Sequence, residues 1–199
     1  MIPGQNELNS FIRFNCDWNK DVSDIEKQSF DHIIHCTFEN YIFNNISLLS
    51  TFRVECCISL LYRCKSPELL HTALTIIDGS FFSLYPYYED IYTLTHVDHT
   101  VVFPDIASYD FEITPDILSD RKTRMETCVL DVFPSFLQHF EYHSYFISFK
   151  CKKRHTVTDD RSVVLLPQTQ KEIFVCGGKI TGIFEAYKSI YTYIINSPP

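Results

Sequence analysis

Two parts of the chain carry similar runs of apolar residues in the same order. In the first part, LLYRCKSP at residues 60–67 precedes ALTIIDGSFFSL at residues 73–84. In the second part, SVVLLP at residues 162–167 precedes KEIFVCGGKITG at residues 171–182. Self-similarity of this kind predicts a duplicated structural unit. Each half reads as a strand, a helix, several antiparallel strands and a second helix, so we expect sheets covered on one face by helices.

The composition is that of an ordinary globular protein. The 199 residues are 45% hydrophobic and 21% charged, and their 15% aromatic content with only 5 glycines favours β-sheet. The formal net charge of −8 argues against unspecific binding to polyanions. Because the sequence has neither a run of about eighteen apolar residues nor the features of a secretory signal, we expect no membrane span and no secretion.

The eight cysteines are expected to be reduced and mostly buried thiols of an intracellular protein. No Cys-x-x-Cys pair occurs, and the nearest approaches to ligand pairs are His35 with Cys36 and Cys151 with His155, so no metal site is expected. The sequence also lacks the P-loop, the Gly-x-Ser-x-Gly, the His-Glu-x-x-His and the Gly-x-Gly-x-x-Gly motifs. We therefore expect neither an enzyme nor a bound cofactor.

Hydrophobic periodicity and turn residues give the expected elements. Asp78 and Gly79 lie between two apolar runs, which is typical of a β-hairpin. Residues 105–122 fit neither half and indicate a polar linker or insertion, and residues 88–102 are ambiguous but fit a helix. The expected strands are residues 8–18, 128–134, 145–153, 161–167 and 171–177, with a β-rich stretch over 41–65. The expected helices are residues 21–34, 134–146 and 183–195.

The end of the chain carries the most specific likeness to a known family. IFVCGGK at residues 173–179 and IFEAYKSIY at residues 183–191 resemble the last strand and the last helix of the TATA-binding protein family. Further similar segments follow the family in collinear order, with insertions around residues 36–52 and 105–122. These segments are residues 60–67, 73–84, 102–111 and 130–134.

The resemblance implies an α+β fold, a pseudo-twofold saddle with a curved antiparallel sheet beneath and helices on the convex face. Its first lobe would span residues 1–104, its linker residues 105–122 and its second lobe residues 123–199. The implied function is that of a nuclear, general transcription initiation factor. Such a factor binds and bends AT-rich promoter DNA in the minor groove and recruits TFIIB-like and TFIIA-like factors and the RNA polymerase machinery. The alternative is a scaffold of the same fold that depends on protein partners instead of binding DNA alone.

The DNA-wedging positions of the family carry over onto this sequence one by one. Aromatic wedges pry base steps apart in the minor groove, but only one of the four matching positions is aromatic here. A different placement of the gap would put Phe52 in the first wedge position of the first lobe. Each matching residue is also an apolar residue that any sheet would use in its core. The four positions are Phe174, Val157, Cys57 and Ile76.

The polar DNA contacts of the family carry over less completely. Arg63 matches a phosphate-contacting arginine, Arg161 lies two residues from the equivalent position of the second lobe, and Lys179 matches a turn lysine. One of the paired asparagines at the sheet centre falls near Ser10. The alternative for Arg63 and Lys179 is that they are solvated surface charges, which is the default for isolated basic residues. The basic run at residues 150–155, KCKKRH, either contacts phosphate or keeps a hairpin edge soluble.

Overall fold

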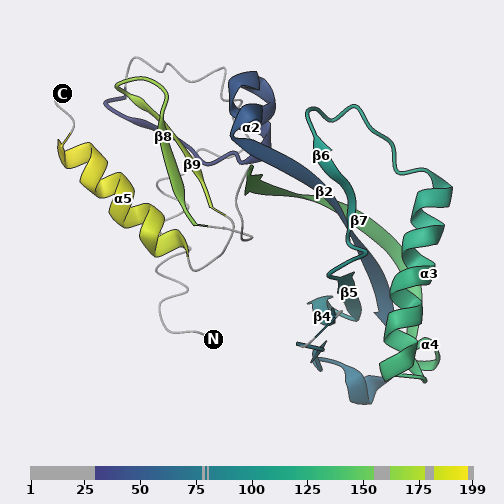
Figure 1. Cartoon of the computed structure of the whole chain (residues 1–199). Helices are drawn as coiled ribbons and strands as arrows, with labels where there is room; N and C mark the ends of the chain where they lie inside the picture. The colour runs from purple at the N-terminus through teal and green to yellow at the C-terminus, as the bar shows by residue number, and fades with distance from the viewer. Residues whose placement is uncertain (1–29, 78, 80, 155–161, 178–181, 197–199) are drawn as a thin grey trace.

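The computed structural model describes residues 30–77, 79, 81–154, 162–177 and 182–196. These residues form two β-sheets and the helices that accompany them (Figure 1). The strands are β1 (Ile33–His35), β2 (Phe52–Cys64), β3 (Leu74–Thr75), β4 (Phe82–Tyr88), β5 (Ile91–His96), β6 (Val101–Ile106), β7 (Phe140–Lys153), β8 (Val164–Pro167) and β9 (Glu172–Cys176). The helices are α2 (Glu39–Asn44), α3 (Pro115–Val132), α4 (Phe136–His139) and α5 (Gly182–Asn196), with short 3-10 helices η3 (Ile46–Ser50) and η4 (Pro67–Leu69).

Strand β2 is the centre of the larger, six-stranded sheet. Strand β7 runs antiparallel to β2 along its whole length, with Phe52 opposite Lys153 at one end and Cys64 opposite Phe140 at the other. Strands β6 and β5 share the second edge of β2, and β4 and β3 extend the sheet beyond β5. Because β2 is paired on both edges, its backbone groups are satisfied and its side chains can be buried.

Helix α3 covers one face of the six-stranded sheet (Figure 1). Side chains of a strand alternate between the two faces, and Leu60 and Tyr62 of β2 are fully buried in one apolar cluster with Met125 and Val129 of α3. The Tyr62 hydroxyl donates a hydrogen bond of 2.8 Å to Glu126 Oε1, so its polar atom is satisfied within the core. The other face of the sheet is not covered by α3.

The sequence before residue 117 explains where α3 begins. The Thr114 side chain accepts a hydrogen bond of 3.4 Å from the backbone N–H of Ile117, and a proline and an aspartate follow at the first two helical positions. These are the residues that favour a helix start. One turn apart on the helix, Lys122 and Glu126 form an ion pair of 3.1 Å that adds to its stability.

Thr114→Ala is expected to lower the free energy of unfolding by about 0.5–1 kcal/mol, because the cap hydrogen bond is lost. The lower part of the usual range applies because this bond is long. Thr127→Ala is the matched control within the same helix, where the exposed hydroxyl only bonds to its own helix backbone. Urea denaturation of both variants checks the prediction, and equal losses would contradict it.

The smaller sheet has three strands, in the order β1, β9, β8. β1 is parallel to β9, whereas β8 and β9 are antiparallel. Phe174 of β9 is fully buried in a second apolar cluster with Ile42 of α2, Phe52 and Val54 of β2, and Cys151 of β7. This cluster connects the smaller sheet to one end of the larger one.

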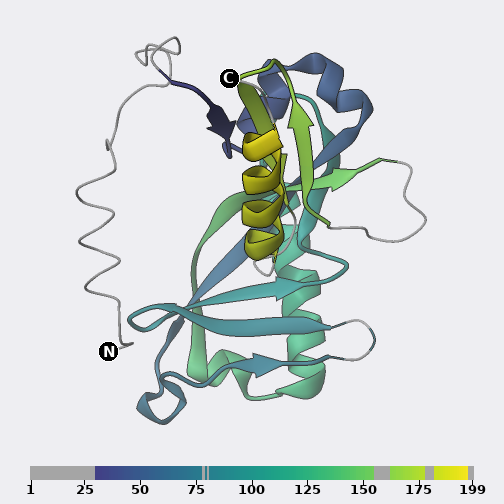
Figure 2. The same ribbon diagram turned by 90° about the vertical axis from the view of Figure 1, so that its left-hand side faces the viewer.

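Helix α5 lies beside β8 (Figures 1 and 2). No residue of α5 is buried. Five large apolar side chains on it are each more than half exposed: Ile183, Phe184, Tyr187, Tyr191 and Ile195. The structure therefore confirms the helix expected at residues 183–195 and leaves these five side chains largely uncovered within the described residues.

Several expected elements are confirmed. Gly79, with φ of 75°, lies between the paired strands β3 and β4, as expected for a hairpin. Strands β8 and β9 form where expected, and residues 145–153 belong to β7. The strand expected at residues 8–18 lies outside the described residues, as does most of the helix expected at residues 21–34. Within the latter, residues 33–34 belong to strand β1 instead.

Other expected elements were wrong. The helix considered for residues 88–102 is replaced by β5 and the start of β6. The strand expected at residues 128–134 is mostly the last part of α3, and the helix expected at residues 134–146 is reduced to the single turn α4. Residues 115–122, within the expected linker, form the first part of α3. In these segments tertiary packing outweighs local periodicity and propensity, towards strand in residues 88–102 and 140–146 and towards helix in residues 128–132.

The α+β class with mainly antiparallel sheets is confirmed, but the pseudo-twofold saddle is not. The described strands form separate sheets of six and three strands, and the segments 60–64 and 164–167, which the resemblance treats as equivalents, lie in different sheets. Strand β6 runs across the boundary expected at residue 104, and β7 pairs with β2 although the two were assigned to different lobes. The division into two lobes and a linker stays a prediction.

Candidate functional site

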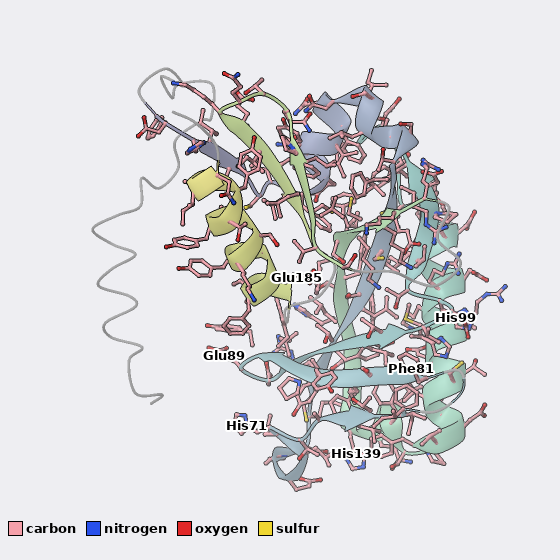
Figure 3. The ribbon with its side chains drawn as sticks, turned by 60° about the vertical axis from the view of Figure 1, so that its left-hand side comes forward. His71, Phe81, Glu89, His99, His139 and Glu185 are labelled. Atoms are coloured by element: carbon pink, nitrogen blue, oxygen red, sulfur yellow. The ribbon has the colours of Figure 1, made fainter. Side chains whose placement is uncertain are left out.

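A pocket lies on the six-stranded sheet and draws residues from five of its strands. Its cavity measures about 340 Å³, which is within the range of sites for small organic molecules. It is lined by Glu55, Ser59, Phe81, Ser83, Thr95, His96, Val97, Thr100, Val101, Ser148, Lys150 and Lys152. Figure 3 shows Phe81 and His99 at the end of the β4–β5 hairpin opposite its turn at Glu89. Phe81 is one of the residues that line the pocket.

Strand register brings the charged residues of this pocket together. Glu55 of β2 lies directly opposite Lys150 of β7, and Lys152 follows Lys150 by two residues, opposite Arg53. Residues two apart on a strand share a face, so these four side chains emerge on the same side of the sheet. On the neighbouring strands, Ser83 of β4 lies opposite Thr95 of β5 and adds hydroxyl groups to the same pocket.

Glu55 holds two basic side chains that would otherwise repel each other. Its Oε1 atom lies 3.3 Å from Arg53 Nη2 and 3.2 Å from Lys152 Nζ, and its side chain is only 5% exposed. Its second oxygen, Oε2, is buried and makes no hydrogen bond within the described residues. A buried oxygen of this kind is costly unless a donor reaches it. A bound ligand that donates a hydrogen bond would satisfy Oε2.

The same face holds a thiol whose reactivity is suppressed. Burial is the main cause that raises the pKa of Cys57, although the nearby Lys150 ammonium acts in the opposite direction. Burial also raises the pKa of the neighbouring Cys56 to about 11. Both side chains are therefore neutral thiols at physiological pH, and a thiolate is the reactive form of cysteine.

A second group of potential ligands lies between β5 and α3, where ring nitrogens of His96 and His99 and Cys128 Sγ come within 4.8 Å of one another. Two features oppose metal binding there. The imidazole rings are stacked, with centroids 4.5 Å apart and an angle of 17°, so their in-plane lone pairs do not converge. His96 Nδ1 also accepts a hydrogen bond from the Asp98 backbone N–H, which leaves the proton on Nε2.

The residues carried over as DNA wedges do not lie on one exposed surface. Phe174 is fully buried, stacked on Tyr41 with centroids 4.7 Å apart, so it takes the core role that the sequence left open. Cys57 is fully buried in β2, and Ile76 is half-buried against the cluster beneath α3. Val157 lies outside the described residues. A wedge must reach a base step, and the two buried side chains cannot do so without unfolding.

The residues carried over as polar DNA contacts are also scattered. Arg63 is exposed at the end of β2 and forms an ion pair of 3.0 Å with Asp90. Arg161, Lys179 and Ser10 lie outside the described residues. The sequence did not single out Glu55 or its pairing with Lys150. The available signal was the presence of polar residues at alternate positions of two apolar strands. These are positions 53, 55 and 59 on one strand and 148, 150 and 152 on the other.

Comparison with known proteins gives one informative relative. No protein-family model matches the chain. Among curated proteins, the chain is similar to the FAD-dependent monooxygenase FPY4 of Fusarium mangiferae, with 27% identity over 176 residues. The match covers 85% of this chain but 45% of that relative. The chain therefore spans less than half the length of the relative that it matches.

This relative overturns the resemblance drawn from the sequence. A flavin-dependent monooxygenase belongs to a different family from the TATA-binding proteins, so the assignment to that family is wrong. The transcription-initiation function, with its minor-groove DNA binding and its partner-dependent alternative, is wrong with it. The expectation that the chain is not an enzyme is contradicted as well, because the relative carries the name of an enzyme.

The expectations on localisation and on partners have different outcomes. Among the described helices, none is both long and apolar enough to cross a bilayer. Nothing supports a nuclear location. The expected partners, which were promoter DNA, TFIIB-like and TFIIA-like factors and the polymerase machinery, stay predictions that rested on the overturned resemblance.

Proposed function

We propose that this chain is the substrate-binding part of a flavin-dependent oxygenase-type enzyme. The pocket on the six-stranded sheet binds the organic substrate through an anionic group, such as a carboxylate or a phenolate. The main support for the proposal is the charge of the residues that line the pocket. Two lysines and one glutamate line it, although the chain as a whole has a net charge of −8. The similarity to the FAD-dependent monooxygenase of Fusarium mangiferae supports the reaction class.

The arrangement of the sheet supports this role. One face is sealed by α3, and the pocket combines charged and hydroxyl groups with the apolar side chains Phe81, Val97 and Val101. Small-molecule sites commonly combine an apolar lining with a few polar groups that fix the orientation of the ligand. An aromatic acid or phenol would satisfy both parts of this lining.

The described residues do not fit the dinucleotide itself. Gly177 follows β9 and Gly182 begins α5, but both face the Val163 side chain. A Cβ atom added at Gly182 would lie 2.8 Å from Val163 Cγ2, and one added at Gly177 would lie 3.4 Å from it. These glycines allow close packing and do not leave a cradle for a pyrophosphate. We infer that FAD is held by polypeptide outside the described residues.

The residues of the pocket have separate roles in binding. A flavin supplies hydride and oxygen chemistry wherever it is bound. Lys150 and Lys152 attract and position the anionic group of the substrate, since charge-assisted hydrogen bonds are stronger than neutral ones. Glu55 holds the Lys152 ammonium in place through its Oε1 atom, and its Oε2 atom accepts a hydrogen bond from a substrate hydroxyl. Fixing the substrate at two points orients it for reaction.

Lys150→Met is expected to weaken the binding of an aromatic carboxylate about 10- to 100-fold, because a charge-assisted hydrogen bond contributes about 1.5–3 kcal/mol. Isothermal titration of the full chain with benzoate measures the change, and benzamide serves as the uncharged comparison. Lys122→Met is the matched control, because Lys122 lies on α3 and lines no part of the pocket. Equal affinities for benzoate in both variants would refute this role of Lys150.

The flavin part of the proposal has its own test. A chimaera in which this chain replaces the matched segment of the Fusarium relative is expected to retain FAD through gel filtration and to consume oxygen when substrate is added. Lys150→Met in the chimaera should abolish the substrate-dependent consumption of oxygen, while Lys122→Met should leave it unchanged. A chimaera that holds FAD and consumes oxygen at the same rate with Lys150→Met would contradict the proposal.

A further inference from the structure

Two cysteine side chains meet where the two sheets join. Cys151 belongs to β7 of the larger sheet, and Cys176 ends β9 of the smaller one. Both are free thiols, and they are 6% and 4% exposed within the apolar cluster that also holds Phe174. The Cys151 S–H donates a hydrogen bond to Cys176 Sγ. Two sulfur atoms in hydrogen-bond contact need only a small approach to form a covalent bond.

The surroundings make the two thiols unequal. The hydrogen bond from Cys151, helped by the charge of Lys153, lowers the pKa of Cys176 in spite of its burial. The same hydrogen bond and burial raise the pKa of Cys151. Since the thiolate is the nucleophile, Cys176 is the sulfur that reacts first and Cys151 is the one that follows.

We propose that Cys151 and Cys176 form a redox site, which hydrogen peroxide converts into a disulfide that joins the two sheets. In the first step the Cys176 thiolate attacks one peroxide oxygen, and the O–O bond breaks. Hydroxide leaves and takes up a proton to become water, and Cys176 becomes a sulfenic acid. In the second step Cys151 sulfur attacks Cys176 sulfur, the S–O bond breaks, and the Cys151 proton leaves with that oxygen as water. Two thiols lose two electrons, which reduce one peroxide to two waters.

The other described cysteines lack such a partner. Cys56 and Cys57 are neighbours in β2, so their side chains point to opposite faces of the sheet. Cys64 donates its S–H to the Ser66 carbonyl oxygen. Cys36 is exposed. Among the described cysteines, Cys151 and Cys176 are therefore the pair whose geometry favours disulfide formation.

Peptide mapping of the full chain tests the site directly. The protein is treated with hydrogen peroxide, blocked with N-ethylmaleimide, digested without reductant and analysed by mass spectrometry. We expect one dominant cross-link between the peptides that contain Cys151 and Cys176, reversed by dithiothreitol. Oxidation that gives other cysteine pairs, or only an oxidised Cys36, would overturn the proposal.

Variants then separate the two roles. In Cys151→Ser the sulfenic acid on Cys176 has no resolving thiol, so dimedone should trap it. In Cys176→Ser dimedone should label Cys151 little, and the cross-link should be absent in both variants. Cys36→Ser is the matched control and should keep the wild-type cross-link. Far-UV circular dichroism confirms that each variant is folded. Dimedone labelling of Cys151 in the folded Cys176→Ser variant, as strong as that of Cys176 in Cys151→Ser, would contradict the order of reaction.

Discussion

Phe174→Ala is expected to lower the free energy of unfolding by about 3–5 kcal/mol, the usual loss for a fully buried phenylalanine. The ring is fully buried, stacked on Tyr41, and meets Phe52 edge-on with centroids 6.2 Å apart. Its removal leaves a cavity where α2, β2 and β9 meet, at the junction between the sheets. Urea denaturation followed by circular dichroism measures the loss.

Phe184→Ala provides the matched control for this substitution. It removes the same ring from α5, where the side chain is 79% exposed. Phe184→Ala should change the free energy of unfolding by no more than about 0.5 kcal/mol, as most surface substitutions do. If Phe174→Ala proved as mild as Phe184→Ala, the ring would not be the centre of the second apolar cluster. The assignment of Phe174 to the core would then be wrong.

Glu55→Gln is expected to lower the free energy of unfolding by about 2 kcal/mol at low salt. Without the carboxylate, Arg53 and Lys152 face each other directly across β2 and β7 with like charges. The loss stays below that of a fully buried ion pair because the Arg53 side chain is 44% exposed and therefore partly screened by solvent. Urea denaturation at low and high ionic strength measures it, and added salt should reduce the loss.

The double variant Arg53→Met with Glu55→Gln separates charge repulsion from lost packing. Removing one of the two cations should recover most of the stability, since the remaining Lys152 then has no like charge opposite it. Glu55→Asp keeps the charge and serves as the control for side-chain length. A double variant that is less stable than Glu55→Gln alone would show that packing, and not charge, explains the effect.

Local signals in the sequence were sufficient for part of the fold. Gly79 lies in a turn between two apolar runs, and residues 183–195 have helical periodicity, so both elements formed as expected. The end of α3 was misread because residues 128–134 are rich in valine, which favours strands. The cap at Thr114 was present in the sequence, but its helix start was assigned to a linker.

The candidate site depends on register, which short-range patterns do not reveal. Glu55 and Lys150 are far apart in the sequence and meet only because β7 pairs with β2 without a shift between Phe52 and Leu61. The resemblance to another family relied on apolar strand residues such as Ile76 and Cys57, and any sheet places such residues in its core. The DNA-contacting roles were therefore transferred to residues whose chemistry is not specific to DNA binding.

The pairing of β2 with β7 also affects how the chain is made. During synthesis β2 leaves the ribosome long before β7, because the two are separated by a stretch of chain that carries four other strands and α3. At usual rates of translation this delay lasts roughly 4–20 s. For that time the edge of β2 that later pairs with β7 has no native partner, which exposes it to pairing with other nascent chains. We therefore expect the yield of folded protein to depend on chaperones that bind extended apolar segments.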